Sequence, residues 1–257
     1  MEITSEQNPR IKNILKLLEK SKERKKQQKF IVEGVQENTF ALDFGYQLLE
    51  IFVNESIFFE EISFPISVEK NSVSQNVYDK IAYRKTTEGI IGIYKYPDFS
   101  LENFPLAKQN SILAVESIEK PGNLGAVFRS ADAMGIDAVF LLDERVDIFN
   151  PNVIRSSVGS VFTIPVYSIS NEKFMQFCIK NEIHIFGTFM NEKSTKLTDI
   201  QFPKKTALLF GTESTGLSDF WKDKITENFQ IPMQGKVDSL NISNAVAISL
   251  YELKKQI

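Results

Sequence analysis

The sequence predicts an α/β protein in which a C-terminal, mainly parallel sheet covered by helices follows a smaller N-terminal α/β unit. Two observations lead to this fold class. Beyond residue 107, apolar runs of strand length alternate with stretches of helical periodicity, which is typical of parallel sheets. The 257 residues, 42% of them hydrophobic, are also enough to bury the core of one large or two smaller domains.

The first thirty residues predict a helix with one apolar and one basic face. Its apolar side chains recur at helical spacing, at Ile11, Ile14, Leu17 and Leu18. Lysine and arginine occupy most other positions up to Lys29. The following run, KFIVEGVQENTFALDFGYQLLEIFVN, predicts a strand, a helix that ends near Gly45, and a strand at residues 51–53. Further strands are expected around residues 62–68 and 89–94.

The stretch YPDFSLENFPLAKQN predicts a linker, because it contains two prolines and has no clear periodicity. We therefore place an N-terminal domain at residues 1–97, the linker at 98–106 and a C-terminal domain at 107–257. Within the last of these, strands are predicted at residues 112–115, 138–142, 162–166, 183–189 and 207–210. The predicted helices span residues 124–134, 153–158, 172–180, 219–224 and 242–255.

Composition limits the classes of function. The net charge is −3, so any affinity for nucleic acid must come from a local basic patch. No apolar run has the length of a membrane span or the form of a signal peptide, and we expect a cytoplasmic protein. One cysteine, Cys178, and one histidine, His184, cannot supply the usual zinc ligands, so no metal site is expected. Counting does not exclude a Cys–His pair, but neither residue has a nucleophile signature around it, and both fit structural roles.

Three polar, glycine-containing loops follow predicted strands, where parallel sheets normally bind ligands. The first is VESIEKPGNLGAVFRSADAMG, which places Asn123 at the start of a helix and Arg129 about two turns into it. Taken alone, an N-cap followed by a surface arginine explains this loop equally well.

The second loop, LLFGTESTGLS, runs from an apolar strand into Gly211, Glu213 and Gly216. Its spacing is close to that of a phosphate-binding P-loop, but Leu217 stands where that loop needs lysine, which disfavours a nucleoside triphosphate site. A turn that simply requires glycines is the alternative. No G-x-G-x-x-G turn follows any predicted strand, so the fingerprint of the ordinary nucleotide-binding fold is missing.

The third loop, IPMQGKVDSLNISNAVAISLYE, leads from the strand-like Ile231 through Gly235 to Ser239 and Asn241, and then into an apolar helix. Capping of that helix explains one of the two polar residues. It does not explain why a polar loop directly after a strand leads into the helix.

In combination and in this order, the three loops resemble the three motifs of the SpoU (TrmH) family of SPOUT methyltransferases. Asn123 and Arg129 stand at the signature positions of the first motif, Glu213 of the second, and Ser239 and Asn241 of the third. The resemblance is strong over residues 107–257. It extends more loosely to NPRIKNILKLL and FIVEGVQ, which are similar to the substrate-binding domain of two-domain members.

The resemblance implies an RNA methyltransferase that uses S-adenosylmethionine as its cofactor and acts on a ribose 2′-hydroxyl. It also implies a deep trefoil knot, an exception to the rule that chains avoid threading, and a homodimer. In the family, backbone groups of the second and third motifs hold the cofactor. Carried over to this sequence with two neighbouring positions, the cofactor-binding residues are Gly211, Ile231, Met233, Leu240, Thr188 and Leu209.

Methyl transfer to a hydroxyl is an in-line displacement, so alignment of donor and oxygen dominates. Family descriptions assign the base to the arginine matching Arg129, but a guanidinium rarely deprotonates. We expect Arg129 to bind the target phosphate and stabilise the oxyanion, and leave proton removal open. Asn123 is expected to hold Arg129 or the ribose, and Glu213 to orient Arg129 or a substrate group. Ser239 and Asn241 are expected to position ribose or cofactor.

The N-terminal basic segment is the expected RNA contact, because phosphate contacts typically dominate such affinity. The residues predicted to make it are Lys20, Lys22, Arg24, Lys25, Lys26 and Lys29. The alternative is a solvated helix whose lysines only aid solubility. The two-domain layout favours ribosomal RNA as the substrate and leaves transfer RNA open.

Two other functions stay open. The first is a non-catalytic RNA-binding protein that keeps the fold, which titration with S-adenosylmethionine would distinguish. The second is a base-methylating member of the superfamily, although the asparagine and arginine of the first motif favour ribose. Nuclease-resistant dinucleotides in digested product RNA would identify the methylated atom.

Overall fold

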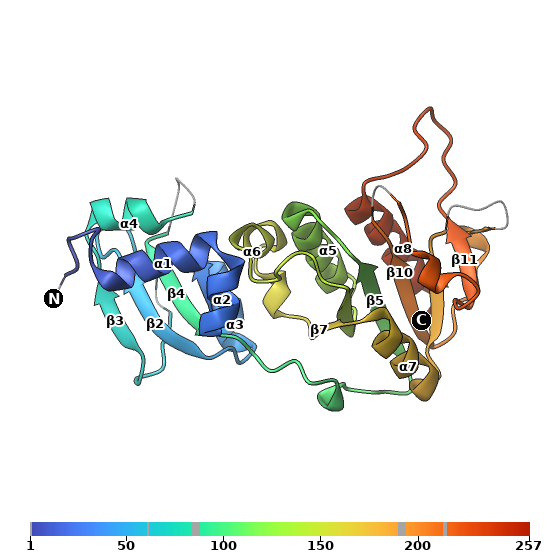
Figure 1. Ribbon diagram of the computed structural model, residues 1–257, viewed down its shortest axis with the longest axis horizontal. Coiled ribbons are helices and arrows are strands. Elements are labelled where there is room, and N and C mark those ends of the chain that lie inside the picture. The colour runs from blue at the N-terminus through green and yellow to red at the C-terminus, as the bar shows by residue number, and fades with distance from the viewer. Residues whose placement is uncertain (1, 61, 84–87, 190–193, 213–214) are drawn as a thin grey trace. The chain divides into compact units, whose positions relative to one another are not determined.

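The computed structural model describes residues 2–60, 62–83, 88–189, 194–212 and 215–257. The chain divides into two compact units, coloured along the sequence in Figure 1. Unit 1 comprises Met1–Asp98 together with Asp147–Thr163, and unit 2 comprises Phe99–Val146 and Ile164–Ile257. Residues 147–163 pack with the N-terminal part of the chain, although they lie within the predicted C-terminal domain.

Unit 1 is built on a sheet with the strand order β1–β4–β2–β3. β4 is antiparallel to β1 and β2, and β3 is parallel to β2. The strands are β1 (Lys29–Glu33), β2 (Leu48–Val53), β3 (Glu69–Ser72) and β4 (Ile90–Lys95). The helices in this part of the chain are α1 (Pro9–Glu19), α2 (Ser21–Gln27), α3 (Val35–Asp43) and α4 (Gln75–Ile81). The strand predicted at residues 62–68 is wrong: Pro65 lies in an irregular stretch there, and the strand begins only at Glu69.

The first helix confirms the predicted division into an apolar and a basic face. Pro9 occupies its first turn, and the Asn8 side chain accepts a hydrogen bond from the backbone N of Arg10. Ile11, Ile14 and Leu17 are fully buried against a cluster that includes residues of β1, β2, β4 and α4. The basic positions of the helix are therefore left on its outer side.

Residues 147–163, which contain α6 (Pro151–Ser157), belong to unit 1, and Phe149 and Asp147 are among the buried side chains that attach them to it. The Phe149 ring stacks on the Phe30 ring at a centroid distance of 3.8 Å. Asp147 is 7% exposed and accepts a hydrogen bond from Arg24 Nε at 2.7 Å. Because a buried charge without its partner is strongly destabilising, this ion pair fixes the segment to α2.

Unit 2 contains a sheet with the strand order β7–β6–β5–β10–β8–β11–β9, and every strand pair in it is parallel. The mainly parallel sheet predicted from the sequence is therefore confirmed. The strands are β5 (Asn110–Glu116), β6 (Ala138–Leu142), β7 (Val166–Ile169), β8 (His184–Gly187), β9 (Thr195–Lys196), β10 (Lys205–Phe210) and β11 (Glu227–Gln230). The α-helices of this unit are α5 (Pro121–Ala133), α7 (Asn171–Asn181) and α8 (Ile242–Gln256).

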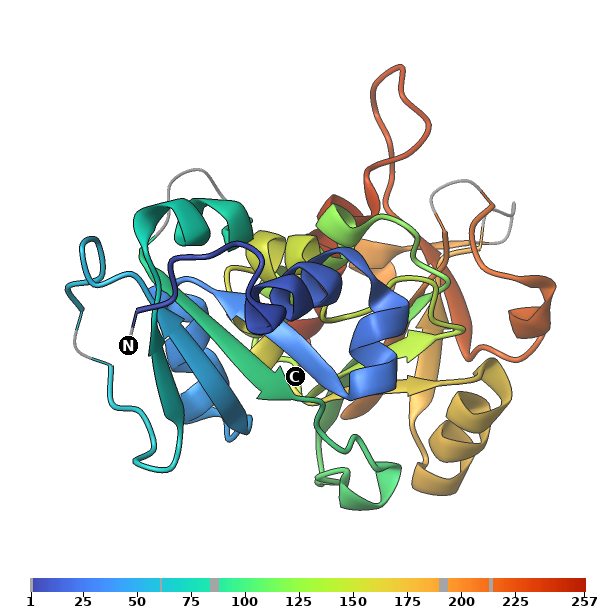
Figure 2. The same ribbon diagram turned by 60° about the vertical axis from the view of Figure 1, so that its left-hand side comes forward.

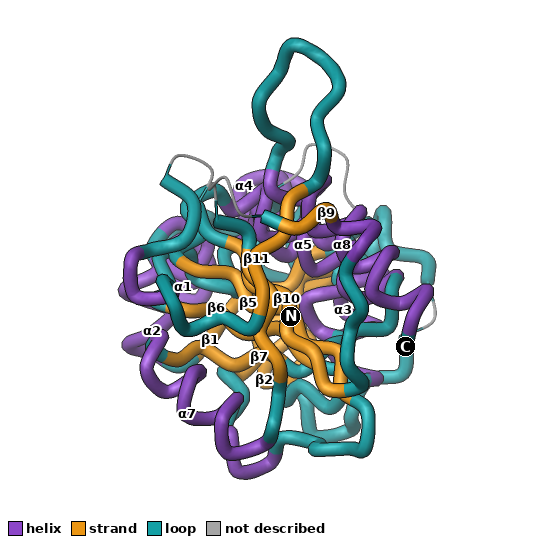
Figure 3. The backbone as a smooth tube through the Cα atoms, turned by 90° about the vertical axis from the view of Figure 1, so that its right-hand side faces the viewer, coloured by secondary structure: helices purple, strands orange, loops and turns teal. Residues whose placement is uncertain are grey.

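Helices cover the sheet of unit 2 on both faces, as Figures 1 and 3 show. On one face, Phe174 and Cys178 of α7 pack into a cluster with Ile112 and Phe140 from the strands. On the other, α5 and α8 pack against each other, and α8 contacts β10. Side chains alternate between the faces along each strand, so a strand buried on both sides is apolar throughout, as in β6.

Two elements predicted for the C-terminal part of the sequence, residues 107–257, are wrong. Residues 160–162 form a 3₁₀ turn, and the strand begins at Val166, after Pro165. The helix predicted at residues 219–224 is only the 3₁₀ turn Asp219–Trp221, because Asp223 has a left-handed φ of 61°. Along the described parts of the chain, no helix combines the length and apolarity needed to cross a bilayer.

Candidate active site

The candidate site lies at the edge of the sheet where the strands of unit 2 end. β5 and β10 are parallel and in register, with Val115 opposite Phe210, so the first and second loops leave neighbouring strands side by side. β8 pairs with the other side of β10, and β11 pairs with β8. Because the carboxyl ends of parallel strands share one edge, the loop after β11 begins there too.

The first motif forms the start of α5. The helix begins at Pro121, a residue whose fixed φ suits the first helical position. Asn123 lies within the first turn, so its interpretation as an N-cap is wrong; Lys120 is the N-cap and makes no side-chain capping bond. Arg129 lies on the exposed side of α5, where its guanidinium is accessible to a substrate.

A hydrogen bond joins the third motif to the first. Asn241 is the N-cap of α8, and its Oδ1 accepts from the backbone N and the hydroxyl of Ser243, at 3.0 and 2.7 Å. Its Nδ2 donates to Oδ1 of Asn123 at 3.3 Å. The contact between α5 and α8 holds the two helix starts together. Asn241 therefore has a role beyond capping, because it also connects two segments 118 positions apart.

The rest of the third loop projects from unit 2, as the segment between β11 and α8 in Figure 2 shows. Residues 234–239 are all exposed. Ser239 lies in this stretch, and its hydroxyl donates to the Asp238 carboxylate at 3.3 Å. The structure thus brings Asn241 to Asn123 and leaves Ser239 on the open part of the loop.

The second motif is a tight loop closed by backbone hydrogen bonds. Thr212 N donates to Gly216 O at 3.0 Å, and Gly216 N donates to Thr212 O at 3.1 Å. Gly216 has a left-handed φ of 71°, which suits glycine. A Cβ atom on Gly211 would lie 2.1 Å from the Gly216 carbonyl, so the loop needs a glycine at position 211 as well. Glu213 lies outside the described residues.

The residues expected to hold a cofactor lie in or after the strands β8, β10 and β11, and the last of them, Leu240, directly precedes the N-cap of α8. Gly211 is buried at the end of β10, and the Leu209 side chain is fully buried within that strand. Thr188 directly follows β8 and is half-buried. In the third loop the half-buried apolar positions are Ile231, Met233 and Leu240. This edge therefore offers backbone groups flanked by apolar side chains.

Sequence reasoning missed one charged residue at this edge. Glu116, the last residue of β5, is only 3% exposed, and its carboxylate accepts hydrogen bonds from Ser218, the last residue of the second motif, and from Trp221, just beyond it. The available signal was an acidic residue at the end of an otherwise apolar strand, inside the first motif's own run. A charge placed there needs buried partners.

The basic N-terminal segment is exposed except at one predicted position. The exposed lysines are Lys20, Lys22, Lys25 and Lys26, and Lys29 is half-buried in β1. Arg24 is 1% exposed; besides Asp147, its guanidinium binds the backbone oxygens of Leu17 and Leu18. Its assignment as an RNA contact is therefore withdrawn, because the guanidinium cannot reach a phosphate without breaking these bonds.

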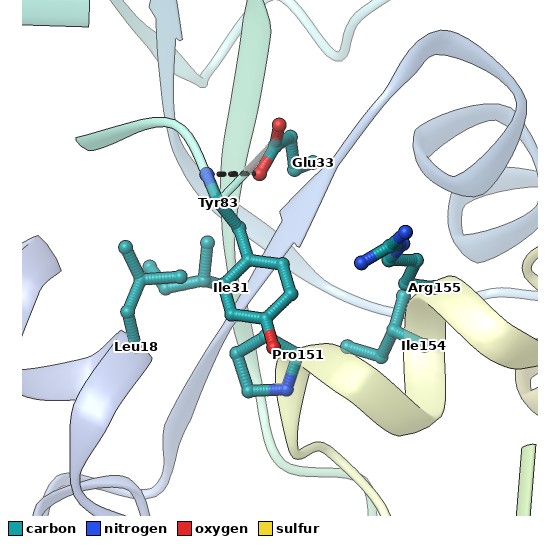
Figure 4. A pocket seen from close by; sticks show the side chains of 7 residues that line it. All are labelled: Leu18, Ile31, Glu33, Tyr83, Pro151, Ile154 and Arg155. Carbon is teal, nitrogen blue, oxygen red and sulfur yellow. Dashed lines mark hydrogen bonds between the residues drawn. The ribbon is translucent and has the colours of Figure 1, made fainter. Parts of the chain in front are cut away.

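Unit 1 also contains a small pocket, shown in Figure 4. Its volume is about 20 Å³, which suits a water molecule and not a nucleotide base. The Tyr83 backbone N donates to the Glu33 carboxylate at 2.7 Å across it. The lining residues are Leu18, Ile31, Glu33, Tyr83, Pro151, Ile154 and Arg155.

The lone cysteine and histidine lie apart from the motif residues. Cys178 is buried in α7, and burial raises the pKa of its thiol, which disfavours the nucleophilic thiolate. His184 begins β8, at the opposite end of that strand from Thr188, and is exposed. Within the described ranges, no three His, Cys, Asp or Glu side chains group together as metal ligands would.

Residues 110–251, which contain all three motif loops, match the SpoU rRNA Methylase family. The chain belongs to this family. Residues 8–92 in turn match the MRM3-like substrate binding domain. Both halves of this SpoU family member thus have recognised counterparts, and the resemblance stated from the three motifs is confirmed.

Similar proteins match this SpoU family member along its whole length. The 23S rRNA (guanosine(2553)-2′-O)-methyltransferase RlmP of Bacillus subtilis is 29% identical, over 98% of this chain and 99% of its own. A solved RNA 2′-O ribose methyltransferase is 33% identical with a TM-score of 0.85, covering 100% and 99%. The AdoMet-bound rRNA methyltransferase from Sinorhizobium meliloti is 26% identical with a TM-score of 0.90, covering 100% and 98%.

Proposed function

We propose that this protein transfers a methyl group from S-adenosylmethionine to a ribose 2′-hydroxyl of ribosomal RNA. The observation that carries the proposal is the hydrogen bond between Asn241 and Asn123, which joins the third and first family motifs at the edge where Gly211 begins the second. The names of the full-length relatives support ribosomal RNA as the substrate class and the 2′-oxygen as the target. Transfer RNA is the second substrate class to be tested.

The residues at the sheet edge suit the cofactor. S-adenosylmethionine has an apolar ring system and several polar groups, which pockets hold with apolar side chains and a few backbone donors and acceptors. Ile231, Met233 and Leu240 supply half-buried apolar surface, and the backbone of the second motif begins beside them at Gly211, at the end of β10. When bound, the cofactor supplies a methyl group on a positively charged sulfur that is ready to be displaced.

The chain's own task is to place the ribose oxygen and stabilise the charge that develops on it. We assign this charge stabilisation, together with binding of the adjacent phosphate, to the exposed guanidinium of Arg129. Asn123, six residues earlier on α5, orients the ribose or Arg129, and its bond to Asn241 fixes the position of its own amide. Glu213 and Ser239 keep the positioning roles expected from the sequence. The group that removes the hydroxyl proton is not assigned.

RNA binding and methyl transfer are assigned to different parts of the chain. We propose that residues 1–97 bind RNA, that residues 98–106 link, and that residues 107–257 carry the transfer site, with residues 147–163 packed on the RNA-binding unit. We also propose the deep trefoil knot of the family for the C-terminal part. The cytoplasm is the proposed compartment, since the substrate is ribosomal RNA.

The proposal assigns RNA binding to the exposed lysines of the N-terminal segment. Replacing Lys25 and Lys26 with glutamate should weaken RNA binding and flatten its dependence on salt, because each lost phosphate contact reduces the salt slope by about one unit. Affinity measured by fluorescence anisotropy across a salt series checks this. A control variant, with Lys204 and Lys222 of unit 2 replaced by glutamate, changes net charge equally. An equal salt slope in wild type and K25E/K26E would show that these lysines do not contact RNA phosphates and serve only solubility.

The proposed homodimer would use the exposed face of α8. Ile248 and Tyr251 are 43% and 58% exposed and lie one turn apart on this helix, which is unusual for large apolar side chains. Tyr251→Asp should therefore shift the protein to monomers in sedimentation velocity. Ile179→Asp, on the exposed side of α7, is the matched control and should leave the dimer intact. A wild-type monomer at all concentrations would exclude the dimer.

The function is tested by mapping ribose methylation across total RNA with and without the gene. The proposal predicts one or a few ribosomal 2′-O-methyl marks that disappear with the gene and return with the wild-type copy. Loss of a mark on transfer RNA would change the substrate class. Titration of the purified protein with S-adenosylmethionine tests the non-catalytic alternative, which predicts no cofactor binding.

A further inference from the structure

Glu116 is the buried carboxylate at the end of β5, and among the described residues it accepts hydrogen bonds from four donors. Its Oε1 accepts from Ser218 Oγ at 2.6 Å, from Asn171 Nδ2 at 2.6 Å and from Trp221 Nε1 at 3.2 Å. Its Oε2 accepts from the backbone N of Ser218 at 2.8 Å. The donors lie 55 to 105 positions away along the chain. A buried charge with this many directed bonds fixes the relative position of the segments that supply them.

The bonds of Glu116 close the second motif. The loop of residues 211–217 leaves β10 at Phe210, which pairs with Val115 of β5. It returns at Ser218, which binds Glu116, the next residue of the same strand. Both ends of the loop are therefore attached to adjacent residues of β5. This attachment accounts for the close approach of Gly211 to Gly216, where a Cβ would meet backbone atoms.

The other two donors, Trp221 and Asn171, connect Glu116 to the core of unit 2 and to the start of α7. Trp221 is fully buried in the core beside Phe174 of α7. Asn171 is 5% exposed and starts α7, directly beyond β7. Burial raises the pKa of Asp143, the residue that follows β6, and repulsion from the Glu116 carboxylate raises it further. Glu116 thus acts on segments that follow β6, β7 and β10 along the same edge.

We propose that Glu116 is a positioning residue for methyl transfer, which holds the second-motif loop in the conformation that binds the cofactor. Glu116 does not touch the reacting atoms; it acts through Ser218 on the backbone around Gly211. The inference rests on the proposed function, because cofactor affinity is its measure. Replacing Glu116 should therefore lower the affinity for S-adenosylmethionine. A variant that lowers only the stability of the fold would not support the inference.

The test is a double-mutant cycle between Glu116 and Ser218, with the affinity for S-adenosylmethionine measured by calorimetry well below the unfolding temperature. In Glu116→Gln, one carboxylate oxygen becomes an NH₂ donor that faces other donors, so we expect affinity to fall about tenfold or more. Ser218→Ala should lower affinity less in the wild-type background and not at all in Glu116→Gln. Glu119→Gln is the matched control, since Glu119 is exposed and pairs with Arg145 at 2.8 Å.

The outcomes separate the inference from the function on which it rests. Wild-type affinity in a folded Glu116→Gln protein would overturn the inference, and so would additive effects of the two substitutions. If Glu116→Gln does not fold, two other variants replace it in the test: Ser218→Ala removes one hydroxyl donor, and Trp221→Phe removes the indole N–H together with part of the buried ring. Reduced affinity in these variants supports the inference, and unchanged affinity overturns it. Failure of the wild-type protein to bind the cofactor would instead contradict the proposed function.

Discussion

Replacing Arg129 with alanine should lower the rate of methyl transfer by about 10²–10³-fold, the usual effect of removing one preorganised donor from a developing oxyanion. The affinity for S-adenosylmethionine should stay at the wild-type value, because the cofactor is assigned to the second and third motifs. Arg129 is exposed on α5, so its removal is not expected to disturb the fold. Single-turnover rates at saturating RNA, together with calorimetric titration of the cofactor, separate the two effects.

The matched control for this prediction is Arg145→Ala. Arg145 is also an exposed arginine of unit 2, and its guanidinium pairs with Glu119 at 2.8 Å. This variant should turn over at the wild-type rate. A wild-type rate in Arg129→Ala would show that Arg129 does not stabilise the developing charge. A loss of cofactor affinity would instead indicate that Arg129 binds S-adenosylmethionine.

Gly211→Ala should nearly abolish methyl transfer by displacing the second-motif loop. The added Cβ would lie 2.1 Å from the Gly216 carbonyl and 2.2 Å from Leu217 N, and backbone atoms cannot give way as a flexible side chain can. A displacement of about 1 Å at a site that depends on alignment costs about 10²-fold in rate. Calorimetric titration should also show weakened binding of S-adenosylmethionine, because the backbone at residue 211 is assigned to the cofactor.

Gly235→Ala is the control for this glycine. It adds the same methyl group to the third loop, where no atom lies within 4 Å of the new Cβ. Activity and cofactor affinity should be unchanged. If Gly211→Ala folds and binds the cofactor as tightly as the wild type, the second-motif backbone does not hold the cofactor.

Much of the fold could be predicted because local signals and tertiary packing agree. The helices begin at residues that suit a helix start, Pro9 in α1 and Asn241 in α8, and their buried positions follow the helical period. The central strands of unit 2 are continuous apolar runs, as expected when helices cover both faces. The two wrong strand predictions fall on short apolar runs, where Pro65 or Pro165 interrupts a strand pattern.

Burial of polar side chains could not be predicted from the sequence. Arg24 looks like its lysine neighbours, and its pairing partner Asp147 lies 123 positions away. The insertion of residues 147–163 into unit 1 depends on that same pair and on the stacking of Phe149 on Phe30. Periodicity reports which positions face a core and carries no information on which distant segment completes it.

The site was predicted in its residue types and only partly in its geometry. The three motifs could be recognised in combination and in their order, yet the bond between Asn123 and Asn241 follows from the packing of α5 on α8. The role of Glu116 could not be predicted, because a carboxylate at a strand end is usually exposed. Its burial is explained only by its hydrogen-bond donors, which are Ser218, Trp221 and Asn171. Interactions across parallel strands become visible only when the strand order is known.

The most direct measurement is the fate of a labelled methyl group. Ribosomal RNA from cells lacking the gene would be incubated with the protein and S-adenosylmethionine carrying a labelled methyl, and then hydrolysed with alkali. A methyl on the 2′-oxygen blocks cleavage of the adjacent phosphodiester, so the account predicts label in alkali-resistant dinucleotides and none with Arg129→Ala. Label in mononucleotides would place the methyl on a base, and RNA without label would exclude methyl transfer to this substrate.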